Sequence, residues 1–205
     1  MKRIIHYSIL LLTIVILYSS CVSGRYVYYF DNPSLDFGQG KWILNETQSN
    51  IAHKYNRLLY QSAQKEFKKI IGDSLIDLTS IRTSKVMPRT IKYELSQSEL
   101  QKLHAYTNCR YLINIKGEVT AKRGEKFSLN DSYSNYSPND RATISIVIYD
   151  LKNGVKISSA KVDTFGFEEF DPTRDEGMKP ELKTELKMTK ATRRLIRKYG
   201  KQRAD

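Results

Sequence analysis

The first 21 residues constrain this chain most, because they decide which part of it remains to fold. Lys2 and Arg3 are basic, residues 4–18 form a mostly apolar run, and two serines precede Cys21. A basic start, an apolar centre and small residues before a cleavage site are typical of a secretory signal peptide. The apolar run of 15 residues is shorter than the roughly 20 residues that a bilayer-spanning helix needs. Residues 1–20 are therefore predicted to be removed.

The signal segment ends in Leu17-Tyr18-Ser19-Ser20-Cys21. This sequence resembles the lipobox of bacterial lipoproteins, as in lipoproteins of the Bacteroidetes, although Tyr18 stands where the usual box has leucine. The resemblance implies that Cys21 is lipidated and becomes the mature amino terminus. Because Val22 rather than aspartate follows, it also implies the periplasmic face of the outer membrane. More than one buried acyl chain anchors a protein stably. Ordinary secretion with cleavage near Cys21, or an uncleaved amino-terminal anchor, are the alternatives.

Positive charge is concentrated near the end of the chain. The formal net charge is +12, of which about +10 remains without Lys2 and Arg3. Residues 179–205 hold ten Lys or Arg against three acidic residues. This segment is either a solvated helix face or a contact for anionic lipid, lipopolysaccharide or cell-wall polymer. The candidate contact residues are Arg193, Arg194, Arg197 and Lys198. Nucleic acid is not an expected partner of an exported protein.

Few residues point to catalysis or metal binding. With Cys21 lipidated, Cys109 is the one remaining cysteine in the sequence, which excludes a disulfide framework within one chain. His53 and His104 lie on predicted helices without a second ligand at metal spacing. The sequence contains no Gly-x-Ser-x-Gly, phosphate-binding glycine loop or His-Glu-x-x-His pattern. We therefore expect no catalytic residue, no metal and no cofactor.

Hydrophobic periodicity predicts the elements of the first half of the mature chain. A strand is expected at residues 41–46 and a long amphipathic helix from residue 49 or 50 to Gly72, with eight apolar residues at helical spacing. A loosely alternating strand is expected at residues 74–81. Ser96 and Glu99 form a capping box, which predicts a second helix up to about residue 108.

Three strands and one helix are expected in the second half. The strands cover residues 110–119, 142–149 and 155–162, and an Asn-Gly turn joins the last two. The final helix covers residues 180–199. The chain is thus predicted to be a single α+β domain (residues 41–205), with about three helices on a mixed five-stranded sheet. Residues 21–40 are expected to be a lipidated cysteine and a tether.

Two predicted loops, residues 122–141 and 164–179, are long and contain aromatic residues that are natural interface anchors. Packing of these side chains back onto the sheet is an equally open interpretation. The aromatic candidates are Tyr133, Tyr136, Phe165, Phe167 and Phe170.

Two passages resemble a known group of envelope proteins. Residues 108–119 read Asn-Cys-Arg-Tyr-Leu-Ile-Asn-Ile-Lys-Gly-Glu-Val, and residues 146–154 read Ile-Val-Ile-Tyr-Asp-Leu-Lys-Asn-Gly. Together with the element order, they resemble the TolB amino-terminal-domain-like group. This group includes the curli-secretion lipoprotein and the outer-membrane lipoproteins that activate penicillin-binding proteins. The resemblance implies a fold and a non-enzymatic assembly role, and no functional residue is carried over.

The sequence therefore predicts a non-enzymatic, lipid-anchored accessory protein of the outer membrane that binds an envelope protein through its loops. The alternative is a binder of anionic glycan or lipid that uses the basic carboxyl-terminal helix. An enzyme is the third hypothesis, and no residue can be nominated for it. The identity of the partner and the oligomeric state stay open.

Overall fold

The computed structural model describes residues 25–32, 34–51, 53–84, 88, 90–120, 141–165 and 180–202. The predicted lipidation site and four of the five loop aromatics lie outside these residues. They are Cys21, Tyr133, Tyr136, Phe167 and Phe170. Phe165 is described by its backbone, as the last residue of a strand.

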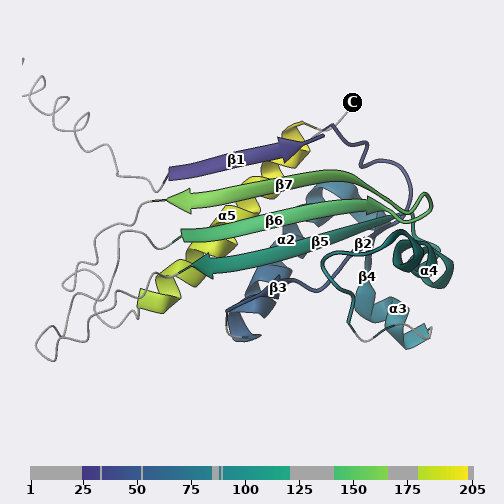
Figure 1. Ribbon diagram of the computed structural model, residues 1–205, viewed down its shortest axis with the longest axis horizontal. Coiled ribbons are helices and arrows are strands. Elements are labelled where there is room, and N and C mark those ends of the chain that lie inside the picture. Colours follow the sequence, from purple (N-terminus) through teal and green to yellow (C-terminus); the bar gives the residue numbers. More distant parts are fainter. Residues whose placement is uncertain are drawn as a thin grey trace, which may run out of the picture.

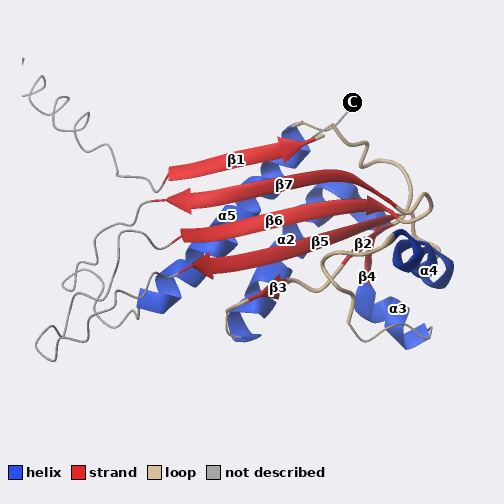
Figure 2. Ribbon diagram, in the orientation of Figure 1, coloured by secondary structure: helices blue, strands red, loops and turns tan. Residues whose placement is uncertain are grey.

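The described residues form an α+β fold on one mixed seven-stranded sheet (Figure 1), which Figure 2 colours by secondary structure. The strand order is β1-β7-β6-β5-β2-β4, and β3 also pairs with β5. The strands β1, β7, β6 and β5 are antiparallel neighbours, whereas β2 and β3 run parallel to β5, and β4 runs parallel to β2. The strands are β1 (Arg25–Asp31), β2 (Trp42–Leu44), β3 (Gln48–Ser49), β4 (Leu75–Asp77), β5 (Tyr111–Thr120), β6 (Arg141–Asp150) and β7 (Val155–Phe165).

Two long helices lie on one face of this sheet, α2 (His53–Ile71) and α5 (Pro180–Lys201) (Figure 1). The main hydrophobic core lies between them and the sheet, where Leu59, Ile146 and Leu195 are fully buried. Two shorter helices, α3 (Leu78–Ser84) and α4 (Gln97–Thr107), enclose a second cluster that includes Leu78 and Leu112. The sheet is therefore covered on both faces at one end and on one face along the rest.

The capping box of α4 and the glycine that ends α2 are confirmed, whereas the predicted start of the first helix at residue 49 or 50 is wrong. Ser49 belongs to β3, Asn50 bonds to the backbone of Val119, and α2 begins at His53. Ser96 caps α4, its hydroxyl accepting from the Glu99 amide at 3.4 Å while the Glu99 carboxylate accepts from the Ser96 amide at 2.8 Å. α2 ends before Gly72, which has a φ of +69°, a conformation that glycine adopts without strain. The Asn-Gly turn between β6 and β7 is also present, and Gly154 has a φ of +67°.

The predicted number of five strands is wrong, because the sheet has seven. The two missed strands are β1, which lies in the segment expected to be a tether, and β3, which has only two residues. β1 pairs with β7, so its partner lies more than a hundred residues away in the sequence. The strand expected at residues 74–81 stops at Asp77 and continues as α3.

Apolar and polar residues alternate in residues 110–119, which predicts a half-buried strand with Asn114 on its solvent side. β5 departs from this pattern. Its first five residues are buried on both faces. Asn114, expected on the wet side, is fully buried and donates to the carbonyl oxygens of Lys92 (3.0 Å) and Tyr93 (2.7 Å). These bonds hold the segment before α4 over this face of the sheet. The segment covers Asn114, and the alternation of residues within β5 gives no information about it.

α5 continues to Lys201, past the predicted end at Gly200. A Cβ atom at Gly200 would lie 3.1 Å from side-chain carbons of Ile70 in α2. Gly200 therefore permits close approach of the two helices, instead of ending α5. The buried residues Met188, Ile196 and Tyr199 show that α5 packs on the domain.

Candidate functional site

The outer surface of α2 and α5 carries eleven exposed basic side chains, which we call the basic helical face. Among the described side chains of these two helices, Glu66 is the one carboxylate, and it is buried. The members of the basic helical face on α2 are Lys54, Arg57, Lys65, Lys68 and Lys69. Its members on α5 are Lys190, Arg193, Arg194, Arg197, Lys198 and Lys201. An amphipathic helix places its polar residues on the side opposite the core, and here both polar sides are basic.

Glu66 joins the two helices beneath this face. The Arg197 guanidinium donates to both Glu66 carboxylate oxygens, at 3.0 and 2.9 Å, and Lys69 donates to the same carboxylate at 3.0 Å. The hydrogen bond from Arg197, with help from Lys69, lowers the pKa of Glu66 to about 2. Arg193 donates to the Ser62 hydroxyl at 2.6 Å. The face is thus held in place at several points by bonds between α2 and α5.

Two further cations join α5 to the edge strand β1. The Arg194 guanidinium lies 4.4 Å from the centre of the Tyr26 ring, and the Lys198 ammonium lies 4.2 Å from that of Tyr28. Cations at such distances are attracted by the ring face. The Tyr199 hydroxyl also lies 3.1 Å from the Ser158 hydroxyl, which donates to carbonyl oxygens at the end of β1. The basic helical face therefore extends to β1.

All four basic residues nominated from the sequence lie on this face, and each has a partner within the domain. Arg193 and Arg197 contact α2, whereas Arg194 and Lys198 contact β1. Sequence reasoning missed the contribution of α2, although residues 53–71 contain a single acidic residue among five Lys and Arg. That local charge bias was a usable signal, but the pairing of α2 with α5 was not visible in the sequence.

The open face of the sheet has a different charge pattern. Its lysines stand next to carboxylates, with Lys161 at 3.1 Å from Asp163, Lys116 paired with Glu118, and Lys156 at 3.8 Å from Asp31. Tyr29 is exposed on this face, with the Lys161 ammonium 5.8 Å from the centre of its ring. Positive charge is therefore balanced on the open face and in excess on the helical face.

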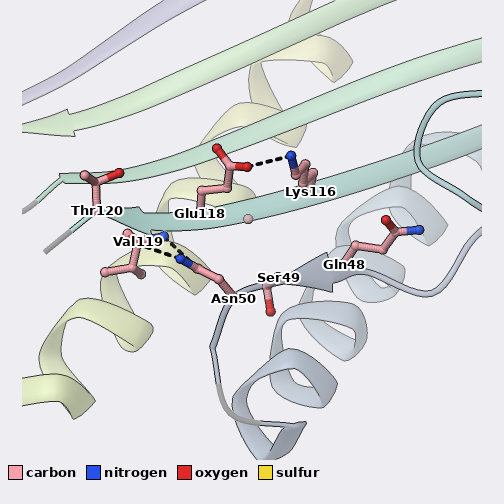
Figure 3. Close-up of a pocket in the computed structure, with 8 residues that line it drawn as sticks. Gln48, Ser49, Asn50, Lys116, Glu118, Val119 and Thr120 are labelled. Carbon is pink, nitrogen blue, oxygen red and sulfur yellow. Dashed lines mark hydrogen bonds and ion pairs between the residues drawn. The ribbon is translucent and has the colours of Figure 1, made fainter.

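A shallow depression of about 350 Å³ lies where β3 meets the end of β5 (Figure 3). The Asn50 side chain lies across it and forms two hydrogen bonds of 2.8 Å with the backbone of Val119. Lys116 and Glu118 pair with each other on the same wall, as the dashed lines in Figure 3 show. Most polar groups of this depression are thus engaged with one another, and we assign it no ligand.

The histidines and Cys109 differ in their surroundings. His53 is exposed at the start of α2, and the His104 Nδ1 atom lies 2.8 Å from the carbonyl oxygen of Cys109. Cys109 itself is buried. Within the described residues, no three His, Cys, Asp or Glu side chains gather as a metal site would require.

In that same part of the chain, no helix has the length and apolar character needed to cross a bilayer.

Comparison with solved structures gives distant neighbours, among them two PelC structures. No protein-family model and no curated protein matches the chain. A PelC dodecamer from Paraburkholderia phytofirmans is similar with a TM-score of 0.48 and 12% identity, over 89% of this chain and 100% of that chain. A variant PelC dodecamer from the same organism has a TM-score of 0.45 and 10% identity, over 86% of this chain and 98% of that chain. At this level of similarity we draw no conclusion from either structure.

Proposed function

We propose that this protein is a non-enzymatic, lipid-anchored component of the cell envelope that binds an anionic partner through the basic helical face. The observation that carries the proposal is the charge of that face. Eleven exposed cations belong to α2 and α5, and the paired carboxylates described near them are Glu66 and Asp73. A surface with this excess attracts anions over a distance set by the ionic strength.

The anchor is the second part of the proposal and rests on the lipobox resemblance at Cys21. It places the domain at the outer membrane, on the periplasmic side. β1 begins at Arg25, so residues 22–24 are all that separate the proposed lipid from the sheet. The proposed anchor is therefore close to the part of α5 that contacts β1.

The anionic-partner proposal is tested by elution from a polyanionic resin. The triple variant Lys65→Glu, Lys190→Glu, Lys201→Glu alters exposed lysines of the face for which no hydrogen bond or ion pair is described. It is expected to elute at clearly lower salt than the parent protein, because the attraction depends on local positive charge.

The matched control is Lys41→Glu, Lys102→Glu, Lys152→Glu, which changes the net charge equally at exposed sites outside α2 and α5. It is expected to elute close to the parent. An equal shift in both triple variants would mean that total charge governs binding and that the helical face has no special role.

A protein partner is the second candidate, and one feature of the topology favours it. Thr120 pairs with Arg141, and Arg25 pairs with Phe165, so the strand ends that flank both predicted aromatic loops lie at the same end of the sheet (Figure 1). Crosslinking in cells, followed by recovery of the tagged protein, tests this candidate. Recovery of one stoichiometric protein, dependent on Cys21, would support it, whereas recovery of lipid or glycan alone would favour the anionic partner.

A further inference from the structure

We infer that the anionic partner of the basic helical face is the bilayer that holds the lipid anchor, so that α2 and α5 lie on the lipid headgroups. This inference rests on the proposed function, since it requires the anchor at Cys21. The basic helical face would bind the headgroups of anionic phospholipids. The open face of the sheet would then point away from the membrane.

The length of chain between the anchor and the domain limits the distance between the bilayer and the basic helical face. Residues 22–24 separate Cys21 from β1, and a chain of that length extends to about 14 Å at most. Tyr26 and Tyr28 lie close to the start of β1, and the Arg194 and Lys198 cations of α5 lie over their rings. The start of the sheet and the adjoining part of the basic helical face are therefore held next to the bilayer.

The spread of the cations favours a surface over a small ligand. α5 has 22 residues and is thus about 33 Å long, and the basic residues run from Lys190 to its end at Lys201 and along α2. They do not converge on a cavity. The depression described at this face, beside β4, is shallow and contains only Lys65 and Lys68 of the eleven cations. A flat array of cations on two adjacent helices fits a plane of phosphate groups.

Tethering makes the bilayer the most concentrated anionic surface that the face meets. A short linker raises the effective concentration of a second binding site into the millimolar range. Each basic residue near an anionic membrane strengthens binding by about fivefold. Leu58, exposed on the outer side of α2, adds apolar area to the same surface. A soluble polyanion would have to compete with a partner that is always present.

The test uses the full-length lipidated protein in vesicles of neutral lipid, or of neutral lipid with about 30% phosphatidylglycerol. A nitroxide is attached at Gln61→Cys, on the exposed side of α2, or at Ser159→Cys, on the open face of the sheet. The native Cys109 is buried and Cys21 carries the lipid. Collision of the nitroxide with a water-soluble nickel chelate reports its exposure, and circular dichroism verifies that each variant is folded.

The inference predicts that the collision rate at Gln61 falls severalfold in anionic vesicles and not in neutral ones, while the rate at Ser159 stays unchanged in both. About 0.5 M salt should reverse the fall, because the attraction is screened. The triple variant Lys65→Glu, Lys190→Glu, Lys201→Glu should abolish the fall, and the control triple at residues 41, 102 and 152 should keep it.

Two results would overturn the inference while leaving the anchor intact. In the first, the protein floats with the vesicles but Gln61 stays equally exposed in neutral and anionic lipid. In the second, added soluble polyphosphate protects Gln61 in neutral vesicles and anionic lipid does not, which identifies a soluble polyanion as the partner. Failure of the protein to float with any vesicle would instead refute the proposed anchor itself.

Discussion

At the scale of single residues, Glu66 connects α2 and α5 beneath the basic helical face. Its side chain is 6% exposed and accepts hydrogen bonds from Arg197 and Lys69. A buried carboxylate is tolerated when it is paired and hydrogen-bonded. Glu66 thereby fixes the separation of α2 and α5 and holds one arginine in a defined position, while the remaining cations keep their exposure to solvent.

The variant Glu66→Gln tests this role. The folded pKa of about 2 lies below the ordinary 4.5, so the ionised carboxylate stabilises the fold fully above pH 4.5, and the stabilisation is lost as the pH falls toward 2. Glu66→Gln should lose about 1–3 kcal/mol of unfolding free energy at neutral pH and show a smaller further loss between pH 4.5 and 2. Urea unfolding across this range measures both effects.

Glu118→Gln is the matched control, because Glu118 pairs with Lys116 on the open face and is half exposed. Exposed pairs contribute little to stability, so this variant should resemble the parent protein. If Glu66→Gln and the parent protein lost stability identically as the pH falls, the contact between Glu66 and Arg197 would not contribute to the unfolding free energy.

At the scale of elements, Gly117 sets how closely the helices approach the sheet. A Cβ atom there would collide with the end of the Met188 side chain and lie 3.3 Å from Ile144 and Leu59. Met188 is fully buried on α5 and Leu59 on α2. β5 therefore meets both long helices at a position where only glycine fits without rearrangement.

A double-mutant cycle at this position tests the packing. Gly117→Ala should cost about 1–3 kcal/mol through overpacking, and Met188→Ala should cost about 2–5 kcal/mol. Because removal of the Met188 side chain frees the space that the new methyl group needs, Gly117→Ala should cost clearly less in the Met188→Ala background. Strict additivity of the two losses would contradict the contact.

The elements also show what the sequence can and cannot predict. The capping box of α4, the Asn-Gly turn and the amphipathic stripe of α2 are local signals, and all three elements were predicted. β1 was missed because its pairing with β7 is not local. The burial of Asn114 was missed for the same reason, since its partners belong to the chain segment before α4.

For the candidate site too, local features could be predicted from the sequence and long-range contacts could not. The basic residues of α5 form a dense local cluster and were nominated from the sequence. Their partners Ser62, Glu66, Tyr26 and Tyr28 lie more than a hundred residues away, so these contacts could not be predicted. The charge bias of residues 53–71 is visible in the sequence, but the position of α2 beside α5 is not. Only the packing of α2 beside α5 turns two polar helix sides into one surface.

At the scale of the whole molecule, charge and anchor define two sides. The helical side has an excess of cations, whereas lysines on the open side of the sheet are paired with acids. The proposed lipid at Cys21 would hold the molecule by β1, beside Arg194 and Lys198. With the proposed lipid at Cys21, residues 22–24 would keep the start of β1 within about 14 Å of the anchor.

The proposed anchor is tested by the intact mass of the mature protein extracted from membranes, with Cys21→Ser in parallel. The expected mature chain begins at Cys21 and carries a diacylglycerol and an amide-linked acyl chain, and Cys21→Ser is expected to abolish both modifications and to release the protein from membranes. A mature chain without lipid, beginning at another residue or retaining residues 1–20, would refute lipidation at Cys21.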